Sequence, residues 1–250
     1  MLTIEKRFIN LLRWDLRFQA RYGFYLLYGF LTIFYTMVLF AIPGAWKEKT
    51  AAILIFSDPA SMGLFFMGAI VLLEKSQKVT SYFAITPLKA REYVASKVLS
   101  LSAIALVVAT ALAFVAGHIA IPSLLAGTFL ASAIFTLCGI IVATKISSLN
   151  QFILATVPIE IIGFVPAILH LFGVTGSFAG KEHTAVSSPL NASLALIDRL
   201  YPANVCMDTV MGKSPSAIGL LITVARIAFL LKAACGCVLK MWQEQGGVKL

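Results

Sequence analysis

Charged residues are scarce in this chain, and acidic residues are scarcer than basic ones. Of the 250 residues only 12% are charged, whereas 60% are hydrophobic. A soluble globular domain is about 45–50% apolar and about 25% charged, so this composition excludes an ordinary soluble protein. We therefore predict an integral membrane protein that crosses the bilayer several times.

Residue types that carry out covalent chemistry or bind metals are also few. The four cysteines show no paired framework, and Cys235 and Cys237 are expected to pack at the end of an apolar helix. The three histidines, His118, His170 and His183, have no metal-ligand spacing. We therefore expect no catalytic residue, no metal site and no cofactor on this chain.

A nucleotide-binding loop is missing as well. Such a loop needs the pattern G-x-x-x-x-G-K-[ST] between a strand and a helix, so that backbone N–H groups hold the phosphates. Gly212-Lys213-Ser214 comes nearest, but Met207 stands at the position of the first glycine. Any ATP and Mg²⁺ that drive the protein would therefore bind to another chain.

The sequence is rich in long hydrophobic runs. A bilayer core about 30 Å thick is crossed by about 20 helical residues, and six runs reach this length. In lipid, a helix pairs backbone groups within its own segment, and the runs lack the alternation of a barrel strand. We therefore predict an all-α integral membrane protein with six transmembrane helices. The runs are Tyr22–Ile42, Ala51–Leu73, Val98–Gly117, Leu124–Thr144, Phe152–Phe172 and Ala217–Leu239.

The residues before the first run are predicted to form an amphipathic helix at the membrane interface. Lys6, Asn10, Arg13, Arg17 and Arg21 recur at spacings of three and four, which places them on one stripe of a helix. Such a helix lies flat among the lipid headgroups; a solvated helix that packs on a partner is the alternative. The chain is then one transmembrane domain over 1–250. Its parts are the interfacial helix (1–21), spans one to five (22–172), an outer segment (173–216), span six (217–239) and a cytosolic tail (240–250).

The distribution of basic residues predicts the orientation. With six spans, thirteen of the twenty Lys and Arg residues fall on the side of both termini and of segment 74–97, and five fall on the other side. Cytosolic loops carry the excess of Lys and Arg, so we predict a multi-pass protein of the inner (plasma) membrane with both termini in the cytosol. The net charge of +9 then reflects orientation and contact with anionic lipid rather than a nucleic-acid partner.

Segment 74–97 is a charged stretch between two hydrophobic runs. Pro87 has no amide hydrogen and disfavours helix at the residue before it, so we expect it to end any helix that arrives from Lys75. Thr86 is then the predicted N-cap of a short second helix that continues to Lys97. The segment is therefore predicted to be a bent, charged helical elbow.

An elbow of this kind suits docking into a groove of a soluble partner. Leu88 and Tyr93 are the predicted anchors, and the charges would set the orientation. The alternative is an ordinary charged inner loop, which every polytopic protein has.

The order of residues in this segment resembles the inner loop of ABC transporter permeases of the type-2 export class. In that class an acidic residue closes the second span, a Thr-Pro-Leu-type turn follows, and a Glu-Tyr pair and a Lys lead into the third span. Lys75 and Thr80 also match, whereas Val79 stands where the class commonly has glycine. The resemblance implies that this loop is the coupling helix against which an ATPase subunit presses. The residues expected to take part in coupling are Glu74, Thr86, Pro87, Leu88, Arg91, Glu92, Tyr93 and Lys97.

The resemblance implies a function as well. The chain would be the permease subunit of an ATP-driven exporter, working as a homodimer or heterodimer with a separate ABC ATPase. Its cargo would be a hydrophobic or amphiphilic small molecule, such as a drug or antibiotic of the fluoroquinolone type. Two alternatives are an ion-gradient-driven secondary transporter, which typically has two related halves, and a membrane-embedded enzyme, which needs clustered reactive groups at one depth. Neither feature is seen in the sequence.

Three polar residues fall inside predicted spans, where ionisable side chains normally need a partner or water. Glu160 and Arg226 stand near mid-membrane in the fifth and sixth spans. They are expected to form an ion pair that holds these spans together; the alternatives are that they line the substrate path or reach the interface separately. Asp58, before Pro59 in the second span, is expected to cap a proline break.

Overall fold

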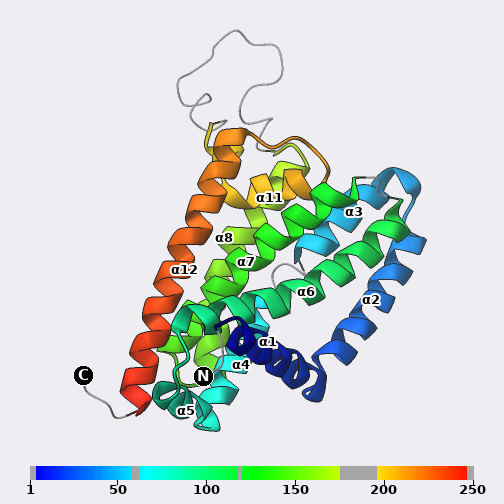
Figure 1. Ribbon diagram of the computed structural model, residues 1–250. Helices are drawn as coiled ribbons and strands as arrows, with labels where there is room; N and C mark the ends of the chain where they lie inside the picture. Colours follow the sequence, from blue (N-terminus) through cyan, green and yellow to red (C-terminus); the bar gives the residue numbers. More distant parts are fainter. Residues whose placement is uncertain (1–3, 58–61, 118–119, 175–195, 247–250) are drawn as a thin grey trace.

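The computed structural model describes residues 4–57, 62–117, 120–174 and 196–246 of the chain. Within these ranges the regular elements are helices and no strand occurs, which confirms the all-α membrane fold (Figure 1). Residues 196–200 are helical in addition to the elements named next. These are α1 (Ile4–Arg21), α2 (Phe24–Ala41), α3 (Gly44–Ile55), α4 (Met62–Ser76), α5 (Val79–Ile85), α6 (Ala90–Ala116), α7 (Ile121–Lys145), α8 (Leu149–Leu171), α11 (Pro202–Val210) and α12 (Ala217–Gly246).

Five helices of the described chain are long and apolar enough to cross a membrane, namely α2, α6, α7, α8 and α12. They coincide with five of the six predicted spans. The remaining predicted span, Ala51–Leu73, falls on two helices, α3 and α4, which lie on either side of residues 58–61. Asp58 and Pro59 lie outside the described residues.

Helices α6 and α7 form the centre of the bundle. α7 packs against α4, α6, α8, α11 and α12, and 56% of the apolar window of both α6 and α7 is buried. The corresponding shares for α2, α8 and α12 are 11%, 17% and 22%. Large side chains on α2 such as Leu26 and Phe40 are 79% and 71% exposed. Soluble monomers rarely expose apolar patches of this extent, so lipid or a second subunit is expected to cover these helices.

The packing of α4 against α7 depends on a glycine. A Cβ atom added to Gly139 would lie 2.7 Å from the carbonyl oxygen of Leu64 and 3.1 Å from the Cβ atom of Met67. Small residues at such positions allow membrane helices to approach closely. The absence of a side chain at Gly139 therefore sets the distance between α7 and the helix that leads into segment 74–97.

Replacement of Gly139 by leucine is expected to lower the free energy of unfolding by about 1–3 kcal/mol, because the added side chain overpacks the α4–α7 contact. The measurement is the thermal unfolding midpoint of the purified protein in detergent. Gly29→Leu is the matched control, because a Cβ atom at Gly29 meets no atom within 4 Å. Equal midpoints for the two variants would show that the close approach at Gly139 is unimportant.

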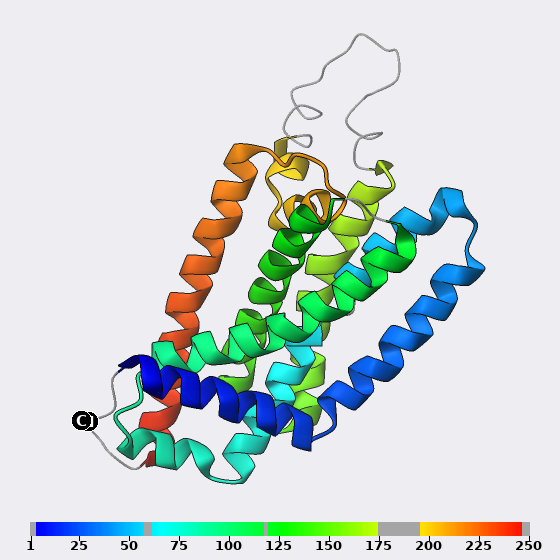
Figure 2. The ribbon, with the colours of Figure 1, turned by 45° about the vertical axis from the view of Figure 1, so that its right-hand side comes forward.

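The bundle has two distinct ends. α1, α5 and the last turns of α12 lie at one end, which we call the α5 end, and α11 lies at the other (Figures 1 and 2). Figure 2 shows α1 running across the α5 end beneath the start of α6. The polar stripe of α1 faces outward, since the five side chains predicted to form it are all exposed: Lys6, Asn10, Arg13, Arg17 and Arg21. The position of this helix at a membrane interface stays a prediction.

At the α11 end, His170 connects α8 to the segment that precedes α12. Its Nδ1 atom lies 2.8 Å from Oδ2 of Asp198, and its Nε2 atom lies 3.0 Å from Oδ1 of Asp208 in α11. Asn204 donates a further hydrogen bond of 2.8 Å to Asp198. These contacts position α11 between α7 and α8.

Candidate coupling site

Segment 74–97 consists of the end of α4, the short helix α5, an extended stretch and the first turns of α6. α4 ends at Ser76, and Lys78 then adopts a left-handed conformation with φ 57° that starts α5. The glycine that the resembled class commonly has falls one position later, at Val79, the first residue of α5. Because left-handed backbone is favourable for glycine and strained for lysine, the tight turn between α4 and α5 is retained here at an energetic cost.

The prediction that Thr86 is the N-cap of the helix after Pro87 is wrong. α5 does end before Pro87, and Thr86 is extended (φ −91°, ψ 155°), as expected of the residue before a proline. However, its hydroxyl donates to the carbonyl oxygen of Phe83 at 3.0 Å and so ends α5 rather than starting the next helix. α6 begins at Ala90 and continues without a break through the third span. The predicted short second helix is therefore the start of a 27-residue transmembrane helix, and most of its side chains up to Lys97 are buried.

The start of α6 is capped by Glu92. Its Oε2 atom accepts a hydrogen bond of 3.2 Å from the backbone N–H of Lys89, the N-cap residue. Arg7 of α1 approaches the other carboxylate oxygen of Glu92 to 3.8 Å and donates a 2.8 Å hydrogen bond to the carbonyl of Pro87. α1 thus holds the extended stretch against the start of α6.

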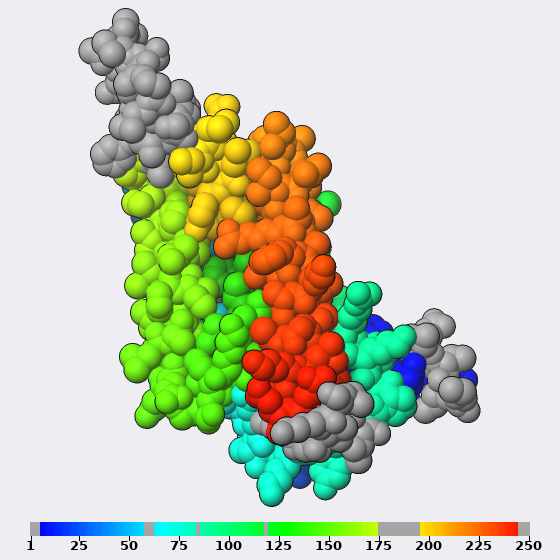
Figure 3. All heavy atoms as spheres, turned by 90° about the vertical axis from the view of Figure 1, so that its left-hand side faces the viewer, coloured from blue at the N-terminus to red at the C-terminus, as the bar shows by residue number. Residues whose placement is uncertain are grey.

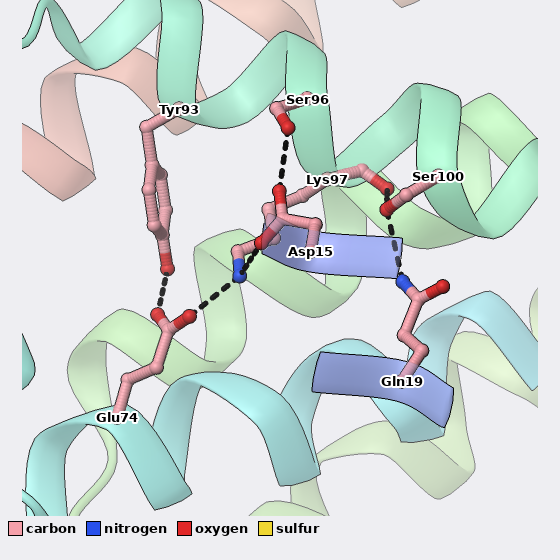
Figure 4. Close-up of polar contacts among 7 residues, drawn as sticks. All are labelled: Asp15, Gln19, Glu74, Tyr93, Ser96, Lys97 and Ser100. Atoms are coloured by element: carbon pink, nitrogen blue, oxygen red, sulfur yellow. Dashed lines mark hydrogen bonds and ion pairs between the residues drawn. The ribbon is translucent and has the colours of Figure 1, made fainter. Parts of the chain in front are cut away.

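A buried cluster lies directly beneath this surface, and we call it the Lys97 cluster (Figure 4). The Nζ atom of Lys97 donates to Oε1 of Glu74 at 2.5 Å and to Oδ1 of Asp15 at 2.6 Å. The hydroxyl of Tyr93 donates to Oε2 of Glu74 at 2.5 Å, and that of Ser96 donates to Oδ2 of Asp15 at 2.5 Å. One cation therefore connects α6 to a carboxylate of α4 and to a carboxylate of α1.

The Lys97 cluster is shielded from solvent. Lys97 and Asp15 are 1% exposed, and Glu74 and Tyr93 are 0% exposed. The rings of Trp14 and Tyr93 lie with their centroids 5.4 and 5.2 Å from the ammonium group, close enough for cation–π attraction. Two carboxylates share one cation. Each carboxylate also accepts one hydrogen bond from a hydroxyl, Glu74 from Tyr93 and Asp15 from Ser96. Removal of one partner from a buried ion pair lowers the free energy of unfolding by about 3–5 kcal/mol, because the other charge stays buried without a partner. A loss of this size is expected for the Lys97 cluster.

Two further contacts extend these connections. Gln19 of α1 donates a buried hydrogen bond of 2.9 Å to the hydroxyl of Ser100 in α6. Lys75, next to Glu74, donates to three carbonyl groups at the end of α7. Its Nζ atom lies 2.8 Å from the carbonyl oxygens of Ala143 and Ile146 and 2.9 Å from that of Thr144. A lysine at a helix C-terminus satisfies carbonyls that have no partner within the helix. The adjacent pair Glu74-Lys75 therefore joins α4 to α1, α6 and α7.

Aromatic rings connect the site to α12. The ring centroid of Trp242, in the last turns of α12, lies 5.6 Å from that of Tyr93 and 5.9 Å from that of Phe83 in α5. Tyr93 and Phe83 are themselves 5.6 Å apart. The three rings form one contact among α5, α6 and α12.

The predicted coupling residues fall into two groups. Glu74, Tyr93 and Lys97 are fully buried and Glu92 is nearly so, whereas Thr86, Pro87 and Arg91 are exposed and Leu88 is half-buried. The prediction that Tyr93 anchors a soluble partner differs from the structure, because its ring is enclosed by Phe83, Trp242 and Lys97. The role of all eight residues in coupling stays a prediction.

Sequence reasoning missed several residues of this site. Tyr82 in α5 is 66% exposed, and it is the one large hydrophobic side chain that is exposed among the described residues of the segment. Asp15, Gln19 and Ser96 lie in the interior beside Lys97. Asp15 had one available signal, since it is an acidic residue in a strongly basic segment and lies away from the basic stripe.

The other predicted polar residues lie elsewhere. Arg226 borders a cavity of about 230 Å³ between α7, α8, α11 and α12, whose walls include Phe56, Phe135 and Tyr201. The ion pair between Arg226 and Glu160 stays a prediction. The helices that carry these residues, α12 and α8, both pack against α7 and α11.

The fold and this site define a polytopic, all-helical membrane protein whose transmembrane helices are linked to a polar loop at one end of the bundle. The model of the fluoroquinolones export permease protein family matches residues 6–230. The match includes all of the Lys97 cluster and nine of the ten named helices in whole or in large part. The chain therefore belongs to this family of export permeases.

Two curated proteins are similar to this chain. Both come from Mycobacterium tuberculosis, one from strain CDC 1551/Oshkosh and one from strain ATCC 25618/H37Rv, and each is named a fluoroquinolones export permease protein. Each is 29% identical over 171 residues, which cover 67% of this chain and 72% of the relative.

Proposed function

We propose that this chain is the membrane subunit of an ATP-driven ABC exporter, and that a separate ATPase subunit docks on the exposed surface of α5 and residues 86–91. One observation supports this most strongly. The loop exposes Tyr82, Pro87 and Arg91, while both of its ends are fixed to the bundle by Lys97 through Glu74 and Asp15. A force applied to such a loop moves helices rather than deforming the loop.

The contacts suggest how that force would spread. Pressure on α5 would act on α4 through the turn at Lys78, on α6 through the extended stretch, and on α12 through Trp242. Lys75 would pass the displacement of α4 to the end of α7. Because α6 and α7 are the most buried spans, their movement would change the packing of the peripheral helices and open a path on one side of the membrane at a time.

The chain would function as a dimer, whether of identical or different permeases. The outward faces of α2, α8 and α12 are apolar and large enough to accept a second subunit as well as lipid. ATP and Mg²⁺ would bind to the ATPase, since the permease sequence has no phosphate-binding loop. Catalysis would thus lie entirely on the partner.

The cargo would be a hydrophobic or amphiphilic small molecule, and fluoroquinolones are the first to test because the relatives carry that name. Fluoroquinolones combine fused aromatic rings with a carboxylate. The cavity beside Arg226 has aromatic walls and a cation, which are complementary to such a molecule in kind.

The orientation follows from charge, with the α5 end in the cytosol and the protein in the inner (plasma) membrane. A membrane-impermeant maleimide should label Tyr82→Cys only after the cytosolic face is exposed, and should label Lys213→Cys in intact cells. The background carries Cys138, Cys235 and Cys237 replaced by alanine. Cys206 can stay, because burial raises the pKa of its thiol to about 12. Labelling of Tyr82→Cys in intact cells would reverse the orientation.

The function is tested by reconstitution in proteoliposomes with a candidate ABC ATPase subunit. Fluoroquinolone movement should require hydrolysable ATP and should persist after ionophores collapse the proton and sodium gradients. A matched control contains an ATPase that cannot hydrolyse ATP. Transport that follows an imposed ion gradient without ATP would instead support a secondary transporter.

A further inference from the structure

A groove of about 830 Å³ runs between the α5–α6 loop and α12. One wall is formed by residues 83–91 and the other by α12 from Ala228 to Gln243. At 1.5 Å per residue, this part of α12 is about 22 Å long. Figure 3 shows α12, in orange and red, exposed along this face, with the start of α6 beside its lower end. The groove therefore extends from the polar end of the bundle into the sixth span.

The charges in this groove have one sign. Lys89, Arg91 and Lys232 line it, and no Asp or Glu is among the described residues of its walls. All three cationic residues are exposed. Arg91 lies near enough to α12 to act electrostatically on Cys235, another wall residue. A ligand of the groove is therefore expected to be an anion.

The remainder of the groove is mostly apolar. Leu231 and Leu239 line the α12 side, and Leu88 and Phe83 line the other. Trp242 contributes to the wall, and its Nε1–H is buried without an acceptor among the described residues. An oxygen atom of a ligand at this wall could accept the hydrogen bond that the indole N–H of Trp242 does not make within the described protein. The walls thus combine three cations, an unmatched donor and a long apolar surface.

We propose that this groove binds one anionic phospholipid, with its phosphate between Arg91, Lys89 and Lys232 and an acyl chain along α12. Lys232 lies seven residues before Leu239, or about 10 Å inside the predicted inner end of the span. A ligand that reaches both Arg91 and Lys232 must therefore enter the hydrocarbon region. Soluble phosphate and acidic peptides do not enter that region, whereas a phospholipid does. The groove shares Lys89 and Arg91 with the surface proposed to dock the ATPase, but lipid binding requires only that the protein spans a membrane, so it is tested on the permease without its partner.

Trp242 offers a local probe of this site. In a variant with Trp14→Phe and Trp46→Phe, Trp242 is the remaining tryptophan of the three in the chain. The detergent-solubilised permease is titrated with phosphatidylglycerol that carries bromine on its acyl chains, which quenches nearby tryptophan fluorescence. Quenching should saturate with brominated phosphatidylglycerol and should be much weaker with brominated phosphatidylcholine.

Replacement of the three groove cations (Lys89→Gln, Arg91→Gln and Lys232→Gln) should raise the half-saturating concentration on the order of 100-fold, since each cation near a membrane surface contributes about a fivefold preference for anionic lipid. The matched control removes three exposed cations from α1 (Arg13→Gln, Arg17→Gln and Arg21→Gln) and should leave quenching unchanged. Circular dichroism and size-exclusion chromatography confirm that both variants are folded.

Other results would overturn the proposal. Equal quenching by the two brominated lipids would show that the groove does not select an anionic headgroup. An unchanged half-saturating concentration in the groove variant would show that its cations do not bind the phosphate. Displacement of the lipid by inorganic phosphate or glycerol phosphate would show a site for free anions instead.

Discussion

Replacement of Lys97 by methionine is expected to destabilise the protein more than any substitution on its surface. The change leaves Asp15 and Glu74 buried without their cation, and loss of one partner from a buried pair costs about 3–5 kcal/mol. The expected result is a large fall in the thermal unfolding midpoint in detergent, or failure to obtain folded protein. The control is Lys232→Met, which removes an exposed lysine from α12.

Two additional variants keep this prediction testable if Lys97→Met does not fold. Tyr93→Phe removes one hydrogen bond to the Glu74 carboxylate and is expected to cost about 1.5–3 kcal/mol, as is typical for hydrogen bonds to charged groups. A triple variant with Lys97→Met, Glu74→Gln and Asp15→Asn removes all three charges and should be more stable than Lys97→Met alone. A Lys97→Met protein as stable as Lys232→Met would contradict the structural role of the cluster.

Simultaneous replacement of Tyr82 and Arg91 by alanine is expected to lower ATP-driven transport by about 30-fold or more while the permease stays folded. Tyrosine and arginine are the residue types that most often dominate interfaces, with losses of about 2 kcal/mol or more on truncation. Both side chains are exposed, so their removal leaves no buried partner without a contact. The measurement is fluoroquinolone transport in proteoliposomes that contain the ATPase.

The matched control for this variant is Trp46→Ala with Lys213→Ala. These residues are an aromatic and a cation near the opposite end of the bundle, and both are exposed. Transport and ATPase binding should be close to wild type in the control. If the Tyr82 and Arg91 variant transports normally, or if the control is equally impaired, the loop is not the docking surface.

The two predictions distinguish residues that stabilise the bundle from residues that would dock the ATPase, which the sequence pattern alone does not separate. Glu74, Tyr93 and Lys97 match the family pattern together with Thr86 and Pro87, and the pattern alone suggests one docking surface. The structure places the first three residues in the buried Lys97 cluster and the others on the exposed loop. The first group should therefore affect stability and the second should affect binding of the ATPase.

The sequence was sufficient to predict the transmembrane architecture because hydrophobic runs are a local property. The bounds of α7 and α8 agree with the predicted spans to within three residues at either end. α6 begins eight residues before its predicted span, because the hydrophobic run starts only at Val98, whereas the helix also contains charged residues whose side chains find partners within the protein. Lys97 illustrates this, since it is accommodated in α6 by two carboxylates.

The composition of the candidate site could be predicted only in part, because its partners are far apart in the sequence. Asp15 lies 82 residues from Lys97, and Glu74 lies 23 residues from it. No local pattern connects these positions, so Tyr93 and Lys97 were expected at a polar surface. The end of α5 at Thr86 was similarly ambiguous, because a threonine before proline can start one helix or end another.

The most direct test of the proposed coupling is photo-crosslinking from position 82. A photoreactive phenylalanine analogue in place of Tyr82 should crosslink to the ATPase in membranes that contain both subunits, whereas the same group in place of Trp46 should not. A Tyr82 position that never reaches the ATPase while ATP-driven transport continues would contradict the account, because α5 would then receive no force from the partner.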